Sequence, residues 1–400
     1  MAIDSEDKRR SVHGYLGPFA VIAPRPDGAL DEADRKHVAG IYRGQLISLA
    51  VFSSLAPAGV SILFLLADTN GRVLTEIKPT IHRVSRRKNG IGAVSFTMAV
   101  TDPKLREELF VVGHKVFLQF DNGLPDWGGA LTGPSEWDGS SVKFEAASGE
   151  WILSTRRTGR GRVFTETQAG AILAQVLSEA DAFSPTGLLA GNIWQGGAAH
   201  SQEYHRATLY GVVDDIVTNM SAEAFDVTAV LESGHIAFYV NLYERQGFSK
   251  PGVALVEGRN VTGVRYRKLD EAINVWHLAG DGDGWADDAR VYSTAVNSES
   301  VGRHGMREDS EVLSGVTEQS AMDAIAAKRL AETAWPTRVM GLTAVNQPPG
   351  RYREYGIGDT LACRLPSFDF GGVAGSFRLE AWEFFPESGE IDLVLLEETV

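Results

Sequence analysis

The chain has 400 residues, a formal net charge of −14 and a pI near 5.2. This length predicts two to four domains, and 44% hydrophobic with 22% charged residues excludes a disordered chain. The acidity argues against a protein that grips nucleic acid, although an acidic surface lets DNA slide past. The single cysteine, Cys363, excludes an intrachain disulfide and a four-cysteine zinc site and fits assembly in a reducing cytoplasm.

The N-terminal region shows no targeting or membrane signal. The opening MAIDSEDKRR is charged and lacks the apolar core of a secretory signal. The most apolar stretch, residues 45–67, is interrupted by Ser53, Ser54, Pro57 and Gly59, so we expect a helix followed by a strand and not a membrane span. Residues 1–58 are predicted to form an extended arm, in which a short helix over Tyr42 to Leu55 stops before Pro57.

Residues 59–160 are predicted to form a first β domain. Short strands bounded by turn residues follow one another, and the expected strands are SILFLLA, RVLTEI, IHRVSRR, AVSFTMAV, HKVFLQFD, DWGGALTG, SVKFEAAS and EWILSTRR. Asn89-Gly90 supplies a hairpin turn, and Val94, Phe96 and Met98 alternate onto one face of the strand after it. So many short strands in about 100 residues predict one antiparallel barrel or sandwich.

Residues 161–250 are predicted to form a small α+β domain. TETQAGAILAQVLSEADAF has apolar residues at helical spacing, with Thr165 or Thr167 as a cap. A Gly-rich loop, a second helix in TLYGVVDDIVTNMSA, and the strands AFDVTAVL and HIAFYVNLY follow.

A second β domain is predicted in two parts that enclose a helical insertion. Residues 251–298 return to strands, residues 299–336 form the insertion, and residues 337–400 are β again. The helix in the insertion spans 317–334, with Ala321, Ile325 and Leu330 apolar and Pro336 marking its end. The predicted fold class is therefore mainly β with α+β character, with two antiparallel barrel-like domains.

Two clusters contain residue types that bind metals. His200 and His205 are five residues apart in a polar loop without an obvious third ligand, which favours a solvated loop. The segment GDGDGWADD gathers Asp281, Asp283, Asp287 and Asp288, the oxygen ligands that calcium prefers. It lacks the EF-hand spacing, and a β-turn explains its Gly and Asp equally well.

No other pattern singles out a catalytic or cofactor site. The basic run Arg156 to Arg162 could meet phosphate, but a solvated linker or an interface patch is the commoner role. Acid pairs such as those in PESGEID are plentiful and none stands apart. The eight tryptophans could bind carbohydrate, although core and interface packing is commoner; they are Trp127, Trp137, Trp151, Trp194, Trp276, Trp285, Trp335 and Trp382. We therefore predict no catalytic residue, cofactor or metal ligand, and no enzyme.

The order of these elements resembles the hub proteins of tailed-phage baseplates, with relatives in contractile injection machines and type VI secretion spikes. The first β domain carries the resemblance through Phe96, Asp102-Pro103, Gly113 with Val116, and Trp127 to Gly129. KFEAASGEWILSTRR resembles the family's strand that leads into D-x-x-x-L-x-x-R, with Gly149 at the Asp position.

The later part of the chain extends the resemblance to roughly residues 60–400. NVTGVRYRKLDEAINVWHLAGDGDG is similar to the start of the family's second tube domain, and REYGIGDTLACRLP resembles its closing strand. GRHGMREDSEVLSGV resembles the family's Y-G-x-R-E segment, with His304 in place of Tyr.

The resemblance implies a homotrimer whose two β domains per subunit form a ring of six similar units. Such a ring matches a sixfold tail tube to a threefold tip and lets DNA pass without sequence-specific binding. The implied partners are the tail tube or distal tail protein, tail-tip spike or fibre proteins, and a tape-measure protein; the implied location is the virion tail.

Two other interpretations remain open from the residues alone. One is a tail-tip protein on a β-rich scaffold that binds or hydrolyses carbohydrate or cell wall. The other is a receptor-binding module, for which the scattered tryptophans and the Asp-rich segment would be the relevant features.

Overall fold

The computed structural model describes residues 60–398 except 198, 221, 281–289, 314 and 367–371. The predicted N-terminal arm with its helix over Tyr42 to Leu55, the four aspartates of the GDGDGWADD segment and Trp285 lie outside the described residues. Within the described part, no helix is long and apolar enough to cross a membrane. The chain is mainly β with a smaller α+β part, as predicted.

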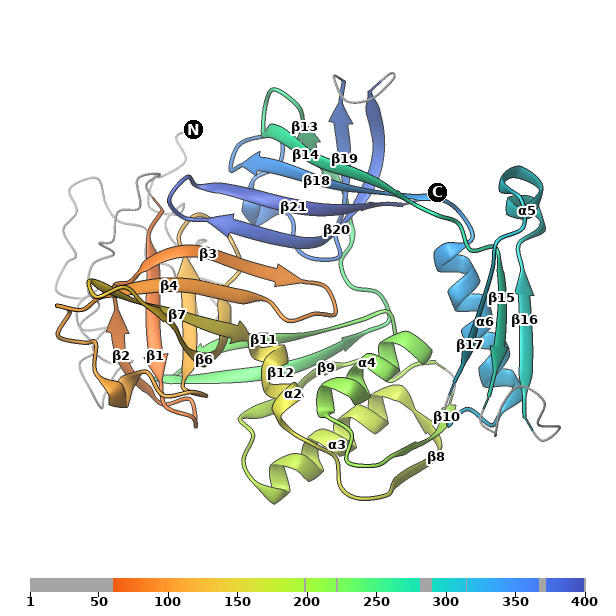
Figure 1. Ribbon diagram of the computed structural model, residues 1–400, viewed down its shortest axis with the longest axis horizontal. Coiled ribbons are helices and arrows are strands. Elements are labelled where there is room, and N and C mark those ends of the chain that lie inside the picture. The colour runs from red at the N-terminus through yellow and green to blue at the C-terminus, as the bar shows by residue number, and fades with distance from the viewer. Residues whose placement is uncertain are drawn as a thin grey trace, which may run out of the picture. The chain divides into compact units, whose positions relative to one another are not determined.

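The first β unit is an antiparallel sheet formed by the strands β1 to β7 (Figure 1). They are β1 (Ile62–Ala67), β2 (Val73–Ile77), β3 (Thr80–Arg87), β4 (Ala93–Ala99), β5 (Lys115–Phe120), β6 (Trp127–Trp137) and β7 (Ser141–Ser148). They pair in the order β3-β4-β7-β6-β5-β1-β2. The predicted turn between β3 and β4 is confirmed, since Asn89 has a φ of 52°, and Val94, Phe96 and Met98 are all buried.

The second β unit has the same strand order as the first. Its strands are β13 (Ser249–Val256), β14 (Val261–Asp270), β18 (Thr337–Val345), β19 (Thr360–Leu365), β20 (Val373–Phe385) and β21 (Glu390–Glu397). The antiparallel order β14-β18-β21-β20-β19 repeats β3-β4-β7-β6-β5 strand for strand. A short 3₁₀ turn lies at the same place in both units: η1 (Glu107–Leu109) between β4 and β5, and η2 (Tyr352–Glu354) between β18 and β19. The outer neighbour differs, because β13 runs parallel to β19 whereas β1 runs antiparallel to β5.

Two register shifts are common to the two units, whereas the shifts between Val261 and Gly263 of β14 and between Pro134 and Glu136 of β6 have no counterpart. β6 shifts register against β7 between Leu131 and Gly133, and β20 shifts against β21 between Leu379 and Ala381. β3 shifts against β4 after Ile81, and β14 shifts against β18 after Val264. A bulge bends the strand and increases its local twist. Matching bulges at matching registers therefore give the two sheets the same local bends.

A glycine in the left-handed conformation lies two residues before β5 in the first unit and two residues before β19 in the second. Gly113 has a φ of 88° and its N–H donates to the carbonyl of Leu131 at 2.8 Å. Gly358 has a φ of 85° and its N–H donates to the carbonyl of Leu379 at 2.8 Å. These are the Gly of the G-x-x-V element and the Gly of the closing strand on which the sequence resemblance rests. Glycine adopts this conformation without the cost that a Cβ would add.

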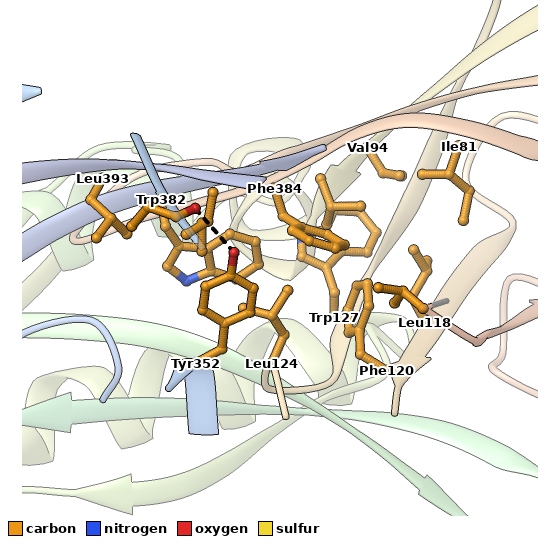
Figure 2. Packing of buried hydrophobic residues seen from close by; sticks show 14 of the residues in the cluster. Ile81, Val94, Leu118, Phe120, Leu124, Trp127, Tyr352, Trp382, Phe384 and Leu393 are labelled. Carbon is orange, nitrogen blue, oxygen red and sulfur yellow. Dashed lines mark hydrogen bonds between the residues drawn. The ribbon is translucent and has the colours of Figure 1, made fainter. Parts of the chain in front are cut away.

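The two units are joined into one sheet by β20 and β3. The second half of β20 pairs antiparallel with β3, from Ala381 opposite Arg87 to Phe384 opposite Val84. We call this pairing the internal joint. One hydrophobic core runs beneath it, and Figure 2 shows Phe120 and Trp127 of the first unit with Tyr352 and Phe384 of the second. The Phe120 and Phe384 rings meet edge to face at 6.0 Å, so the units share packing as well as hydrogen bonds.

An α+β layer covers the other face of the first sheet. Its elements are α2 (Gly149–Thr155), β8 (Arg162–Gln168), α3 (Ala169–Phe183), β9 (Leu188–Ile193), β10 (Ala199–Tyr204), α4 (Leu209–Asn219), β11 (Ala224–Glu232) and β12 (His235–Tyr243). Leu65 of β1 and Phe117 of β5 belong to the core of this layer, whereas Phe64 and Leu118 belong to the shared β core. Because β1 is buried on both faces, its sequence ILFLLA is continuously apolar and does not alternate.

Three local predictions in this region are corrected. EWILSTRR is not a strand, because residues 149–155 form the helix α2. Three adjacent apolar residues fit either state, and here Ile152 and Leu153 pack into the helical core. Thr165 and Thr167 do not cap α3, since both lie in β8 and its N-cap is Gln168. The segment predicted as a Gly-rich loop contains the strands β9 and β10.

The segment between β14 and β18 has a small core of its own. It contains β15 (Val275–Ala279), β16 (Tyr292–Val296), α5 (Ser298–His304), β17 (Glu308–Val312) and α6 (Gln319–Thr333). Trp276 and Leu278 of β15 pack against Met322 and Ile325 of α6. The predicted helix over residues 317–334 is confirmed by α6. The sequence reasoning missed α5 and β17.

The two left-handed glycines should differ in their tolerance of alanine. Gly113→Ala adds only backbone strain, since the nearest atom to its Cβ, in Thr69, is 3.9 Å away; we expect a cost of about 1 kcal/mol. Gly358→Ala should cost about 3 kcal/mol, because its Cβ would also lie 2.4 Å from the carbonyl oxygen of Gln246. Chemical denaturation measures both. Gly252→Ala, with no atom within 4 Å, is the matched control and should be near neutral; equal losses at all three positions would contradict the assignment.

Candidate assembly surface

The structure does not bring the predicted metal-binding histidines together into a site. His200 is buried in β10, and burial lowers its pKa, partly countered by the charge of Asp215. The side chain of His205 is 67% exposed and its Nε2 lies 2.8 Å from Glu203. Across the described residues, no group of three His, Cys, Asp or Glu side chains is placed to hold a metal ion.

The basic run Arg156 to Arg162 makes contacts within the α+β layer. Arg156 donates to the carbonyls of Ala180 and Ser184 at the end of α3, at 3.0 and 2.6 Å. Arg162 pairs with Glu179 at 2.5 Å. These arginines therefore stabilise α3 and its surroundings. The phosphate contact considered from the sequence has no support in these contacts.

A hollow of about 410 Å³ lies over the internal joint and is lined by four arginines and two acids. Arg83 pairs with Glu383 at 3.3 Å and Arg265 pairs with Asp392. Asp392 is one of the acids of the PESGEID segment. Because each acid pairs with an arginine of another strand, the hollow has mixed charge and does not hold two facing carboxylates of the kind that a glycosidase uses.

The tryptophans divide clearly by burial. Trp127, Trp276 and Trp382 are buried in cores. Trp137, at the end of β6, is 66% exposed. Val111 and Val112, which precede Gly113, are also exposed. Val112 lies close to β6, since a Cβ added at Gly133 would be 3.6 Å from its Cγ2 atom. Val112 thus lies against the same strand that carries Trp137, and contiguous exposed apolar patches commonly mark interaction sites.

These residues lie beside an open sheet edge. β6 pairs with β5 only through Ala130, and beyond Leu131 its backbone pairs with β7 alone in the described part of the chain. At the far end of the strand order, β14 pairs along its length only with β18 among the described strands. Unpaired backbone N–H and C=O groups on such edges are ready to bind another strand. The two edges are the candidate assembly surface of this protein.

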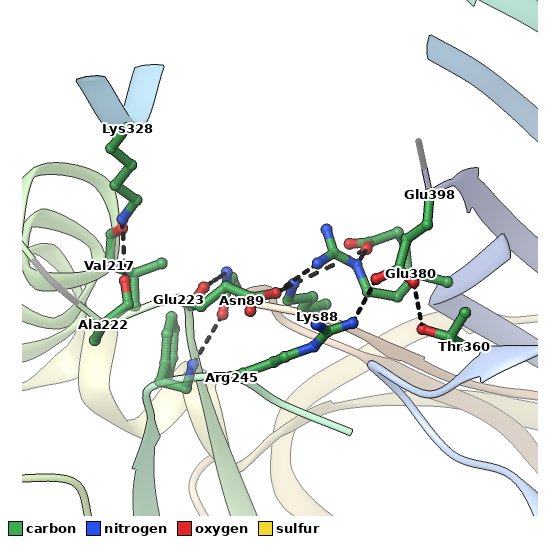
Figure 3. Close-up of polar contacts among 12 residues, drawn as sticks. Lys88, Asn89, Val217, Ala222, Glu223, Arg245, Lys328, Thr360, Glu380 and Glu398 are labelled. Atoms are coloured by element: carbon green, nitrogen blue, oxygen red, sulfur yellow. Dashed lines mark hydrogen bonds and ion pairs between the residues drawn. The ribbon is translucent and has the colours of Figure 1, made fainter. Parts of the chain in front are cut away.

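A polar junction fixes the α+β layer against both β units (Figure 3). Glu223, just before β11, accepts from Lys88 at 2.5 Å and from Arg378 of β20 at 2.6 Å. Arg378 also pairs with Glu380 at 2.6 Å. The side-chain amide of Asn89 donates to the carbonyl of Glu223, and its oxygen accepts from the N–H of Phe225 at 2.9 Å. Since the Lys88 side chain is only 5% exposed, the junction depends on Glu223.

Lys328 of α6 connects the inserted segment to the end of α4. Its ammonium group donates to the carbonyls of Val217, Met220 and Ala222, the last two at 3.1 and 3.0 Å. Three donors meet three acceptors, and a cation at the C-terminal end of a helix is favoured by the helix dipole. Burial lowers the pKa of Lys328, partly countered by the charge of Glu332. The inserted segment is thereby held to the α+β layer.

Glu223→Ala should destabilise the fold by about 2 kcal/mol, because it leaves the buried Lys88 without its closest acid. Denaturant unfolding measures the loss. Glu299→Ala is the matched control, since it breaks an exposed pair with Arg303 within one helix and should cost less than about 0.5 kcal/mol. A loss for Glu223→Ala as small as that of the control would show that the junction contributes little.

Glu150→Gln should become more stabilising as the pH rises from about 5 to 8. Glu150 is buried on α2 and accepts from the N–H of Val227 at 3.0 Å, and burial raises its carboxyl pKa above the usual 4.5, partly countered by Arg86. The folded state therefore holds this proton more tightly than the unfolded state, and stability is lost as pH rises through the raised pKa. Glutamine keeps the acceptor and does not ionise. Melting temperatures across the pH range test this, and a constant difference between variant and wild type would contradict it.

The sequence matches no protein-family model and no curated protein sequence. Solved structures of three tail proteins, two of them from prophages, are nevertheless similar along most of their length. A prophage tail protein gp18 from Listeria monocytogenes is 14% identical, with a TM-score of 0.55 over 84% of this chain and 94% of that one. The 43 kDa tail protein of prophage MuSo2 from Shewanella oneidensis is 13% identical, with a TM-score of 0.55 over 84% and 97%.

A tail protein from Neisseria meningitidis is 12% identical, with a TM-score of 0.55 over 85% of this chain and 96% of that chain. Identities of 12–14% establish a common fold and nothing finer. The resemblance recognised in the sequence is confirmed at that level: the chain has the fold of phage tail proteins.

Proposed function

We propose that this protein is the hub of a phage-tail baseplate, a structural subunit that acts by forming a ring. The observation that carries the proposal is the repeated β unit. The two units agree in strand order, β3-β4-β7-β6-β5 and β14-β18-β21-β20-β19. They also agree in two bulges and in the left-handed glycine that precedes β5 and β19. A chain with two such units can occupy two equivalent places around one axis.

Three copies of the chain would then give six similar units. A ring of this kind fits a sixfold tail tube on one side, because each β unit offers the tube a similar surface. It fits a threefold tip on the other side, because each chain has one inserted segment and one α+β layer. Interfaces in such a permanent assembly are expected to bury well above ~2,000 Å².

The charge of the chain supports a channel through which DNA passes. A formal net charge of −14 repels phosphate, so a polymer of phosphates would not adhere to an acidic lumen. Shape and interface area are sufficient for this function, and no catalytic residue, cofactor or metal is required. The proposed partners are further copies of the chain, the tail tube or distal tail protein, the tip spike or fibres, and the tape-measure protein. The proposed location is the virion tail.

The full chain, purified at micromolar concentration, should have three times the 43.3 kDa mass of the chain by native mass spectrometry. Electron-microscopic averages of the same sample should show threefold symmetry and an open centre, because the two β units of each chain would line the axis. A monomer at that concentration, or a ring without a hole, would contradict the proposal. A monomer that binds cell-wall glycan would support the alternative of a carbohydrate-binding tail-tip protein.

A further inference from the structure

We infer that the ring closes by strand pairing between the open half of β6 in one copy and the open edge of β14 in the next. This inference rests on the proposed ring and adds which residues join the copies. Its template is the internal joint, in which β20 pairs with β3 inside one chain. Because β6 is the counterpart of β20 and β14 is the counterpart of β3, each chain has a second copy of both partners that no described strand occupies.

The register of the internal joint defines its hydrogen bonds. The N–H of Lys88 donates to the carbonyl of Glu380 at 2.8 Å. Hydrogen-bonded and non-hydrogen-bonded pairs alternate along an antiparallel ladder. Trp382 and Arg86 therefore form a hydrogen-bonded pair, and Glu383 and Ser85 form a non-hydrogen-bonded one.

The pairing partners of β6 and β20 show which residues of β6 correspond to the residues of β20 in the internal joint. β6 faces β7 as β20 faces β21, and the shared bulge after Leu131 and Leu379 aligns the two strands. The counterparts in order are Gly133 for Ala381, Pro134 for Trp382, Glu136 for Glu383 and Trp137 for Phe384.

The same comparison applies to β14. β14 faces β18 as β3 faces β4, and the shared bulge after Val264 and Ile81 aligns them. The counterparts in order are Arg267 for Val84, Lys268 for Ser85, Leu269 for Arg86 and Asp270 for Arg87. The predicted pairing between copies therefore sets Glu136 opposite Lys268 and Trp137 opposite Arg267.

Exposure supports a second copy at the edge of β6. Phe384 is fully buried because the first β unit lies against it through Phe120 and β3. Its counterpart, Trp137, is 66% exposed, because in the described part of the chain β6 has no further unit beyond this edge. A neighbouring copy paired through β14 would supply the missing unit.

The joint between copies is not identical to the internal one. Pro134 stands where Trp382 stands and has no N–H, so one hydrogen bond of the template cannot form. β6 also shifts register against β7 between Pro134 and Glu136. A proline and a bulge on an edge strand hinder unspecific pairing. We therefore expect a joint that forms with the matching edge of β14 and resists other strands.

The geometry points to a closed ring and not a dimer. The two edges differ, so the contact is head to tail, and such contacts close into a ring when the rotation between neighbours allows it. If each joint repeats the rotation of the internal one, the six β units of three chains are equally spaced. The occupant of each edge is therefore another copy of the same chain.

A disulfide across the proposed joint tests it. Facing residues at a non-hydrogen-bonded pair have Cα atoms about 4.5 Å apart, which a disulfide can span. The double variant Glu136→Cys with Lys268→Cys should, after mild oxidation, run on a denaturing gel as a covalent series that ends at the trimer. Glu136→Cys with Gly263→Cys is the register control and should stay monomeric on the gel; Gly263 has open space around its Cβ position.

A third variant keeps the test decisive. Ser85→Cys with Glu383→Cys places the same pair at the internal joint. After oxidation it should lose its two engineered thiols, keep only the thiol of the native Cys363, and gain no mass on the denaturing gel. If native mass spectrometry gives a trimer and the internal pair closes, but Glu136→Cys with Lys268→Cys stays uncrosslinked, the strand joint is wrong and the ring survives. If no trimer forms in the wild type, both the ring and the joint fail. Equal crosslinking by the register control would also overturn the joint.

Discussion

The pairing of β20 with β3 is the contact on which the rest of this structure depends. A β-sheet leaves unpaired N–H and C=O groups at its margins, and a protein must cover, blunt or pair them. The internal joint pairs one edge of each β unit with the other unit. It also brings Phe120 and Phe384 into contact in the core that the two units share. Among the described strands it leaves one comparable edge unpaired on each unit, on β6 and on β14. The same backbone requirement that joins the units within a chain therefore favours joining chains to one another.

The likeness of the two β units lies in the backbone more than in the side chains. Gly113 and Gly358 have nearly the same φ and donate to equivalent leucine carbonyls. By contrast, Trp137 and Pro134 occupy the places of Phe384 and Trp382. Strand order, bulges and left-handed glycines fix how a sheet bends, whereas the side chains respond to what covers each place. Repeated geometry with different residues is what a ring of similar but non-identical positions requires.

Sequence patterns predicted most strands but could not predict their pairing. Alternation at Val94, Phe96 and Met98 and the turn at Asn89 were sufficient for β3 and β4. They failed at Glu150 to Thr155, where adjacent apolar residues fit a helix as well as a strand. The order of strands, the internal joint and the junction around Glu223 join residues more than 100 positions apart, and no local pattern contains that information. The open edges were likewise invisible, because exposure of Trp137 depends on which strand is missing beside it.

The inserted segment lies at a place in the fold that is compatible with the two symmetries of the proposed ring. The first two strands of the first unit, β3 and β4, are joined by the tight turn at Asn89. The corresponding strands of the second unit, β14 and β18, are separated by the segment that contains β15, β16, β17 and α6. An insertion at a turn leaves strand pairing intact, because only the connection changes. In the proposed ring the sheets would therefore repeat six times around the axis while the insertion repeats three times. Lys328 holds the insertion to the end of α4 in the α+β layer, so these two parts of the chain are fixed to one another.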